Sequence, residues 1–155
     1  MALVDDEDFE ALSRFKWCVL RTKGAFTVVR GVKVGIGIRK IVRMHRTLIM
    51  LPSGFQVDHI DRNPLNNQKF NLRGCSIAEN NRNHGLSVRN TSGFKGVSFD
   101  KERGTYKAQV GLRSGTKVIG RFKTAEEAAR AYDEASKKYH SDFSCGNKDL
   151  GLLPD

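Results

Sequence analysis

The chain has 155 residues, a formal net charge of +10 and a pI near 9.8. A balance this basic favours a polyanionic partner over a neutral metabolite. The lack of any apolar run of membrane-spanning length argues against a membrane protein. Three cysteines, far apart in the chain and odd in number, argue against a disulfide framework and a cysteine-based zinc site. We therefore expect an intracellular, cytoplasmic protein that binds nucleic acid.

The charges are divided into blocks along the chain. Residues 1–13 carry five acids and no base, whereas residues 14–88 carry 14 bases and three acids. Residues 89–123 carry nine bases and two acids, and residues 124–155 carry four bases and seven acids. Two basic blocks, each beside an acidic segment, predict two surfaces that face nucleic acid and have solvated opposite sides.

The first half of the chain is expected to form short elements. Residues 4–17 have helical periodicity, and residues 18–43 alternate apolar and polar positions between glycines, which predicts two or three strands. Residues 44–51 predict a short helix, and a strand through residues 56–59 follows it. The side chains expected to pack inward from the first helix are Phe9, Leu12 and Phe15.

A turn-rich loop and a second helix follow that strand. Residues 61–67 are dominated by Asn and Asp, which cap and turn the backbone, and residues 71–75 are typical of a returning strand. Ser76 and Glu79 have the spacing of a capping box, so the next helix is expected to begin after Ser76. The order is therefore strand, loop, strand, helix.

Asp58, His59 and Asn80 form the pattern that points most directly to chemistry. A carboxylate oxygen and a carboxamide oxygen suit a hard divalent cation. Water and phosphate would complete the coordination shell of that cation. An imidazole can serve as general base toward an attacking water, which typically raises the reaction rate about 10²–10⁴-fold. Because successive strand residues face opposite sides, His59 reaches that water only if the strand is locally distorted. The pattern predicts metal-assisted hydrolysis of a phosphodiester.

The other polar candidates have less specific signals. Asn71 is expected to pair with the backbone of the histidine turn and hold it in place. Asn80 and His84 are four residues apart and would share one helix face, where His84 could be a metal ligand, a phosphate contact or neither. His45 is expected to be structural or to contact phosphate, and His140 to lie solvated at the end of the last helix.

The second half of the chain predicts three strands and one long helix. The strands are expected at residues 94–99, 105–113 and 116–122, after a polar linker, and Thr124 with Glu127 forms a second capping box. The helix carries the acids and the sheet the bases, so the open face of the sheet is the expected nucleic-acid surface. The helix face that would dock on the sheet comprises Ala125, Ala128, Ala129, Tyr132, Ala135 and Tyr139.

The motif around Asp58 and His59 resembles the HNH endonucleases of ββα-metal fold, in the branch common among homing endonucleases of introns and phages. The resemblance implies that His59 is the general base, that Asp58 and Asn80 bind the metal and that Asn71 orients the histidine loop. His84 falls where other branches carry a further metal-site histidine. A carboxamide at position 80 implies one Mg²⁺ or Mn²⁺ ion per site rather than zinc. The matching segments are residues 57–61, 63–67, 71–73 and 79–81.

Residues 93–147 resemble the AP2/ERF DNA-binding domain, in which a three-stranded antiparallel sheet packs on one helix and reads the major groove. The strongest matches are residues 93–97, 120–122 and 124–135. Ser98, Gly111 and Val118 stand where plant members carry Arg or Trp, which implies weaker direct readout of guanine. By this resemblance, the DNA-binding side chains are Lys95, Ser98, Arg103, Lys107, Gln109, Arg113, Thr116 and Lys117.

Together these patterns predict an α+β protein of two modules. An N-terminal segment and a ββα-metal HNH module would occupy residues 1–88, with the HNH core at 44–86. The AP2/ERF-like module would occupy residues 89–155, with its core at 93–147. The expected function is that of a divalent-metal-dependent homing endonuclease from a phage or bacterial mobile element. It would nick double-stranded DNA, need no obligate protein partner, and act in the cytoplasm of a bacterial or phage-infected cell.

Two alternatives stay open at this point. One is a sequence-specific DNA-binding regulator that retains an inactive HNH fold, since motif residues can persist after activity is lost. The other is an RNA-binding protein, which would need stacking aromatic residues on the sheet. The expected sheet offers few beyond Phe99 and Tyr106.

Overall fold

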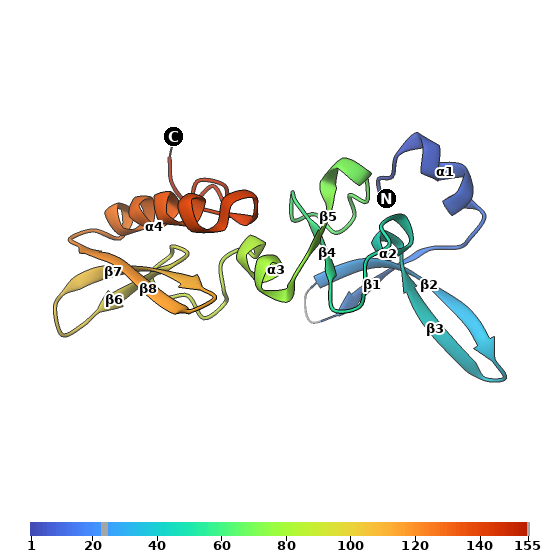
Figure 1. The fold of residues 1–155 in the computed structure, drawn as a ribbon, viewed down its shortest axis with the longest axis horizontal. Helices are drawn as coiled ribbons and strands as arrows, with labels where there is room; N and C mark the ends of the chain where they lie inside the picture. Colours follow the sequence, from blue (N-terminus) through green and yellow to red (C-terminus); the bar gives the residue numbers. More distant parts are fainter. Residues whose placement is uncertain (23–24, 155) are drawn as a thin grey trace. The chain divides into compact units, whose positions relative to one another are not determined.

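The computed structural model describes residues 1–22 and 25–154, and the chain divides into two compact units, Met1–Asn80 and Asn81–Asp155 (Figure 1). We call them the N-terminal unit and the C-terminal unit. The architecture mixes antiparallel sheets with a few helices. The functional division at residues 88 and 89 stays a prediction. In the described part of the chain, no helix has the length and apolarity needed to cross a bilayer.

The N-terminal unit contains two antiparallel sheets, one of order β1-β2-β3 and one formed by β4 and β5. The three-stranded sheet packs on a small core of Leu12, Val28 and Met44. The chain's single tryptophan, Trp17, packs against this core. The elements are α1 (Asp6–Ser13), β1 (Cys18–Thr22), β2 (Ala25–Gly35), β3 (Ile38–Arg43), α2 (Met44–Leu48), β4 (Gln56–His59), a 3-10 turn (Lys69–Asn71), β5 (Leu72–Cys75) and α3 (Ile77–Asn83), whose last turn enters the C-terminal unit.

The first helix is shorter than its apolar pattern predicts. α1 ends at Ser13, so only Leu12 is buried, while Phe9 and Phe15 are 63% and 45% exposed. The expected inward packing of these two phenylalanines is therefore wrong. Phe15 lies beyond the helix end, where its ring is 3.6 Å from the guanidinium carbon of Arg30, a cation–π arrangement.

The C-terminal unit is a three-stranded antiparallel sheet, order β6-β7-β8, packed on one long helix. Its core joins Ala108 and Val110 of the sheet to Ala128, Ala129 and Tyr132 of the helix, which confirms the expected docking face. Its elements are β6 (Val97–Asp100), β7 (Thr105–Leu112), β8 (Gly115–Phe122), α4 (Ala125–His140) and a 3-10 turn (Ser141–Phe143).

Two details of this unit depart from expectation, and one agrees. The capping box of Thr124 and Glu127 is confirmed. β6 begins three residues later than predicted because Gly96 adopts φ +73°, in the left-handed region, and ends the preceding turn. His140 is buried rather than solvated, with its Nε2 2.8 Å from the carbonyl oxygen of Gly111. Burial lowers its pKa.

Candidate active site and nucleic-acid interface

Asp58 and His59 are the last two residues of β4, which pairs with β5 so that Asp58 lies opposite Arg73. The carboxylate is 5% exposed, and its Oδ2 accepts hydrogen bonds from Arg73 Nε at 2.8 Å and Nη2 at 2.7 Å. A buried carboxylate needs such a partner, because an unpaired buried charge is costly. The ion pair fixes the direction of the Asp58 carboxylate on one face of the hairpin.

Asn80 is linked to this same hairpin. Its Nδ2 donates to Oε1 of Gln56 at 2.7 Å, and Gln56 precedes Asp58 by two positions on β4. Residues two apart in a strand project from the same face. Gln56 therefore connects Asn80 of α3 to the face that carries Asp58. The capping box of Ser76 and Glu79, confirmed here, sets the start of that helix.

His59 has a different environment. Its ring packs edge-on against the ring of His45, with centroids 5.3 Å apart and an interplanar angle of 84°. Burial lowers the pKa of His59, against the opposing effects of a hydrogen bond with the Asn67 side chain and of the Asp61 and Asp58 carboxylates. Burial, reinforced by the neighbouring His59, lowers the pKa of His45 to about 4. Both imidazoles are therefore neutral at pH 7, the form in which an imidazole accepts a proton.

Asn71 holds the loop that follows His59. Its Oδ1 accepts from the backbone N–H of Asp61 at 2.9 Å, and its Nδ2 donates to Asp61 Oδ1 and to the carbonyl of Asn66, both at 2.8 Å. Burial raises the pKa of Asp61, but hydrogen bonds from Asn63, Asn66 and Asn71 outweigh it and lower the pKa. The buried carboxamide thus fixes the backbone two residues beyond the histidine.

The donor set of this hairpin fits a hard cation. Asp58 offers a carboxylate and Asn80 a carboxamide, and Mg²⁺ is commonly held by one or two carboxylates with water and substrate phosphate. Within residues 1–22 and 25–154, no three His, Cys, Asp or Glu side chains gather where they could hold a metal. A structural zinc site, which takes four protein ligands, does not fit this arrangement.

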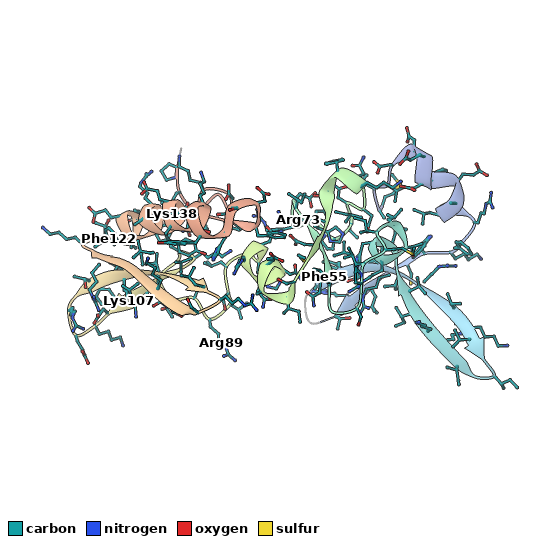
Figure 2. All side chains as sticks on the ribbon, viewed as in Figure 1. Phe55, Arg73, Arg89, Lys107, Phe122 and Lys138 are labelled. Atoms are coloured by element: carbon teal, nitrogen blue, oxygen red, sulfur yellow. The ribbon has the colours of Figure 1, made fainter. Side chains whose placement is uncertain are left out.

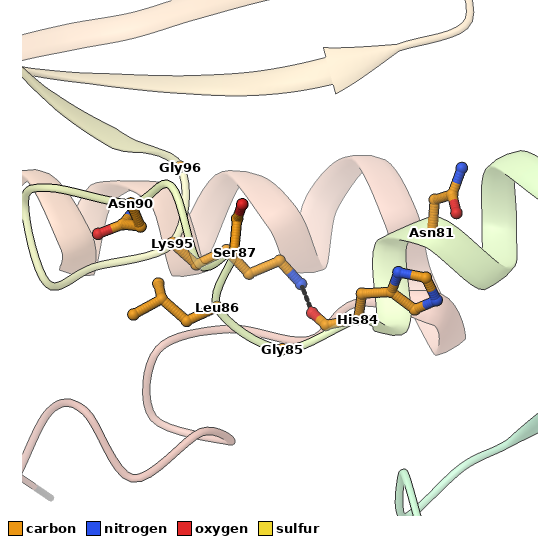
Figure 3. Close-up of a pocket in the computed structure, with 8 residues that line it drawn as sticks. All are labelled: Asn81, His84, Gly85, Leu86, Ser87, Asn90, Lys95 and Gly96. Atoms are coloured by element: carbon orange, nitrogen blue, oxygen red, sulfur yellow. Dashed lines mark hydrogen bonds between the residues drawn. The ribbon is translucent and has the colours of Figure 1, made fainter. Parts of the chain in front are cut away.

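His84 is not on the helix face predicted for it. α3 ends at Asn83, so His84 lies just beyond the helix, in the C-terminal unit, where it is exposed. The helix expected to carry both Asn80 and His84 therefore ends one residue before His84, and a metal-ligand role for His84 stays a prediction. His84 lines an open hollow of about 490 Å³ together with Asn81, Leu86, Ser87 and Lys95, among others (Figure 3).

Lys95 also departs from its predicted place on the sheet. Its Nζ donates to the carbonyl oxygens of Arg82 and His84, at 2.7 and 2.6 Å, where α3 ends (Figure 3). A lysine at the last carbonyls of a helix satisfies acceptors that have no partner within the helix. The Lys95 ammonium therefore closes a helix end.

The open face of the C-terminal sheet can be read from its register. Ser98 lies opposite Lys107, and Lys107 lies opposite Arg121, each pair projecting away from the buried Ala108 and Val110. Lys107 lies on the sheet and Lys138 on α4 (Figure 2). The predicted residues that alternate onto this face are Ser98, Lys107, Gln109 and Thr116.

The remaining predicted contacts lie elsewhere. Lys117 projects toward α4, where its Nζ donates to the hydroxyl of Tyr139 at 2.8 Å. Arg113 is exposed in the turn between β7 and β8. Arg103 pairs with Asp100 in the turn before β7, at 3.3 Å.

Three side chains whose contacts the sequence reasoning missed, Arg73, Gln56 and Arg121, contribute to these surfaces, together with His45, which was expected to be structural or to contact phosphate. Arg73, Gln56 and His45 contact Asp58, Asn80 and His59, and Arg121 joins the open sheet face. Plain strand alternation across the β7–β8 turn would place Gly120 opposite Lys107, and a register shift between Ala108 and Gln109 puts Arg121 there instead. The other three contacts depend on strand register and on the packing of α2, which no short spacing reveals.

The comparisons with known proteins point to one family. A family model described as HNH endonuclease matches residues 50–82, which include Asp58, His59, Asn71 and Asn80. An uncharacterized HNH endonuclease of Acanthamoeba polyphaga mimivirus is 32% identical over 150 residues, which cover 95% of this chain and 74% of that protein. The chain therefore belongs to the HNH endonuclease family, and it is a nuclease.

Two further relatives match single regions of the chain. Protein 3.8 of Escherichia phage T7 is 45% identical over 60 residues, 39% of this chain and 50% of that protein. An AP2-like ethylene-responsive transcription factor of Oryza sativa subsp. japonica is 38% identical over 64 residues, 40% of this chain and 10% of that protein. No solved structure matches the chain.

Proposed function

We propose that this nuclease is a divalent-metal-dependent DNA endonuclease of the homing type, which nicks one strand of a duplex. Asp58 and Asn80 would bind one Mg²⁺ or Mn²⁺ ion, and His59 would act as the general base. The observation that carries the proposal is the pair Asp58–His59, whose neighbouring side chains occupy separate environments. The carboxylate is ion-paired with Arg73, and the imidazole is held neutral beside His45.

The chain's own residues suffice for the proton transfer. The neutral His59 accepts a proton from water as that water's oxygen attacks the phosphorus, and the P–O3′ bond breaks on the opposite side. The 3′ oxygen leaves and is protonated by solvent. When bound, the cation would act as a Lewis acid toward the phosphate and the leaving oxygen. Asn71 keeps the loop after His59 in one conformation, which preserves the alignment that such attack requires.

The C-terminal unit is proposed to target the nuclease as an AP2/ERF-like DNA-binding module. Its support is a three-stranded antiparallel sheet on one helix, the partial match to the rice transcription factor, and the bases Lys107 and Arg121 on the open face. Replacing both by glutamine should lower the slope of log affinity against log salt by about 2, because each phosphate contact contributes about 0.9. An unchanged slope would assign DNA anchoring to another surface.

A second candidate function is a DNA-binding regulator with an inactive nuclease site. The observation in its favour is the ion pair of Arg73 with Asp58, because a guanidinium on that carboxylate competes with a cation for the same oxygens. If Arg73 only orients the carboxylate, Arg73→Gln should lower metal affinity or leave it unchanged. If Arg73 blocks the site, the same substitution should create cleavage that the wild type lacks.

A cleavage assay distinguishes the two candidate functions, whereas a DNA-binding assay does not. Supercoiled plasmid that carries a site bound by the protein should be converted to open circles with Mg²⁺ or Mn²⁺ and remain intact with EDTA. Linear product would indicate coupled cuts in both strands. No product in either metal from a plasmid shown to be bound would contradict the nuclease proposal and favour the regulator.

A further inference from the structure

The N-terminal unit carries a basic surface outside the site described above. In the described register, β1 pairs with β2 only as far as Val29, and beyond this point β2 pairs with β3. Residues 30–42 therefore form a two-stranded antiparallel extension, which continues past β1 as a projecting hairpin (Figure 1). We call residues 30–42 the ribbon. At about 3.4 Å per residue, its strands are roughly 20 Å long.

The ribbon lies in a stretch of unusual charge. No Asp or Glu occurs between Glu10 and Asp58, whereas ten Lys and Arg residues lie in that interval. Lys33 and Arg39 are exposed and directly opposite each other in the register. Like charges in this relation destabilise a strand pair. None of the salt bridges among the described residues includes Lys33, Arg39 or Lys40. The free ribbon therefore carries a repulsion that an anionic partner would relieve.

The bases occupy both faces of the ribbon. Lys33 and Arg39 project from one face, and Lys40, opposite Val32, projects from the other. A charge on each face suits a groove that has phosphates along both walls. The major groove of B-DNA, about 12 Å wide and 8.5 Å deep, admits a two-stranded ribbon.

The tip of the ribbon is apolar and exposed. Ile36, in the tip turn, is 99% exposed, and Val34 and Ile38 beside it are 57% and 63% exposed. Ile41, near the base of the ribbon and opposite Gly31, is 54% exposed. Basic residues on an edge strand can simply prevent sheet-to-sheet association. That explanation does not cover the exposed isoleucines, which would promote association. Apolar side chains amid bases do suit DNA, where they contact thymine methyl groups or base steps.

The ribbon is also continuous with the catalytic residues. β3 ends at Arg43, α2 begins at Met44, and His45 of α2 packs against His59. A duplex held by the ribbon would therefore be held by the same segment that supports the proposed base.

We propose that the ribbon is a second DNA-binding element, which enters the major groove beside the cut site with Lys33, Arg39 and Lys40 on the phosphates and Ile36 at the base edges. The choice of DNA as the occupant rests on the proposed function. Anchoring is thus divided between the ribbon and the C-terminal sheet, and the ribbon supplies affinity that does not depend on the C-terminal unit.

The test compares two triple variants of the full chain that lose the same charge. The ribbon variant is Lys33→Gln, Arg39→Gln and Lys40→Gln. The control is Arg130→Gln, Lys137→Gln and Lys138→Gln, all exposed on α4. Binding to a fluorescein-labelled mixed-sequence duplex is followed by anisotropy at several salt concentrations, in EDTA. The ribbon variant should lower the log–log salt slope by about 2 to 3, and the control should leave it unchanged.

Two companion variants keep the result interpretable. Lys33→Arg with Arg39→Lys retains charge and should retain the wild-type slope, which excludes a folding artefact. Ile36→Asp should weaken binding at least about fivefold, because it places a carboxylate at the base edges. A ribbon variant whose slope equals that of the control would overturn the proposal. The proposal would also be overturned if the ribbon variant kept its DNA binding but lost binding to anionic lipid vesicles. That result would assign the ribbon to a membrane surface.

The experiment is independent of cleavage. A lowered salt slope together with an inactive plasmid assay would retain the ribbon as a DNA contact and reject the nuclease mechanism. Normal nicking with an unchanged slope would retain the mechanism and reject the ribbon.

Discussion

The β4–β5 hairpin of the N-terminal unit and the β6–β8 sheet of the C-terminal unit are held by different forces. Around the hairpin, three asparagines, Asn66, Asn67 and Asn71, are 8%, 0% and 2% exposed and bond to the loop backbone or its side chains. Behind the sheet, Ala108 and Val110 are fully buried against the alanines and Tyr132 of α4.

The difference matches what each region has to position. Hydrogen bonds are directional, so a network of buried carboxamides fixes the orientation of the backbone that carries His59. Apolar burial is not directional, yet it gives a stiff platform whose outer face can vary. Under the proposed function, hydrogen bonds therefore orient individual reacting groups in one unit, and packing supports a contact surface in the other. The following predictions test that division, beginning with the largest effect.

The division predicts that chemistry and binding separate. His59→Ala should lower the cleavage rate about 10²–10⁴-fold, because the general base is lost, and should leave the DNA dissociation constant within about twofold. Lys107→Ala should have the opposite profile, with weaker binding and a nearly unchanged rate on bound DNA. Single-turnover cleavage and anisotropy measure the two quantities. A His59 variant that cleaves at the wild-type rate would remove His59 from the role of base.

A substitution that disrupts packing in the C-terminal unit should leave the β4–β5 hairpin folded. A Cβ added at Gly96 would lie 2.0 Å from Cδ2 of Tyr132, at a φ of +73°. Gly96→Ala should therefore destabilise this unit by about 3 to 5 kcal/mol. Gly93→Ala is the matched control, because φ there is +80° and no atom lies within 4 Å, so about 1–2 kcal/mol is expected.

The readout for this pair is a two-probe denaturation. Circular dichroism should show early unfolding of Gly96→Ala, while fluorescence of Trp17, in the N-terminal unit, should keep its wild-type midpoint. Equal midpoints for Gly96→Ala and Gly93→Ala would contradict the close approach of Tyr132.

The hairpin should depend on single hydrogen-bonding side chains. Asn71→Ala should destabilise the N-terminal unit by about 2–4 kcal/mol, because it leaves the Asp61 N–H and the Asn66 carbonyl without their partner. Asn63→Ala, at an exposed position that makes one side-chain bond to Leu65 N, should cost less than about 1 kcal/mol. Urea unfolding followed by Trp17 fluorescence compares them. Similar costs would mean that the network is not what holds the loop.

The smallest expected effect concerns pH. The pKa of His45 is about 4 in the folded protein and about 6.5 unfolded, so the unfolded chain binds the proton more readily. Its stabilising contribution is complete above pH 6.5 and is lost as pH falls toward 4. Between pH 7 and pH 5 the N-terminal unit should lose about 2 kcal/mol from this group. The His45→Gln variant should not show this part of the stability loss between pH 7 and pH 5. The same pH dependence in the variant would show that other groups cause it.

The sequence predicted the elements of both units well, because strand alternation, capping boxes and the alanine face are local patterns. It also predicted that Asn71 holds the turn after His59, since both residues lie within one short motif. It failed for Phe9, Phe15 and His140, whose burial depends on where a helix ends and on contacts with distant strands. The contacts of Arg73 with Asp58 and of Lys95 with the end of α3 depend on register and loop path, which residue spacing does not encode.

The central claim is that Asp58 binds the cation and His59 takes the proton. The most direct test is the single-turnover nicking rate as a function of Mg²⁺ concentration for wild type, His59→Ala and Asp58→Asn. We predict that His59→Ala lowers the maximal rate and leaves the half-saturating Mg²⁺ concentration unchanged. Asp58→Asn should raise that concentration at least tenfold, or prevent saturation. A His59 variant with a normal maximum and a shifted Mg²⁺ dependence would contradict the assignment.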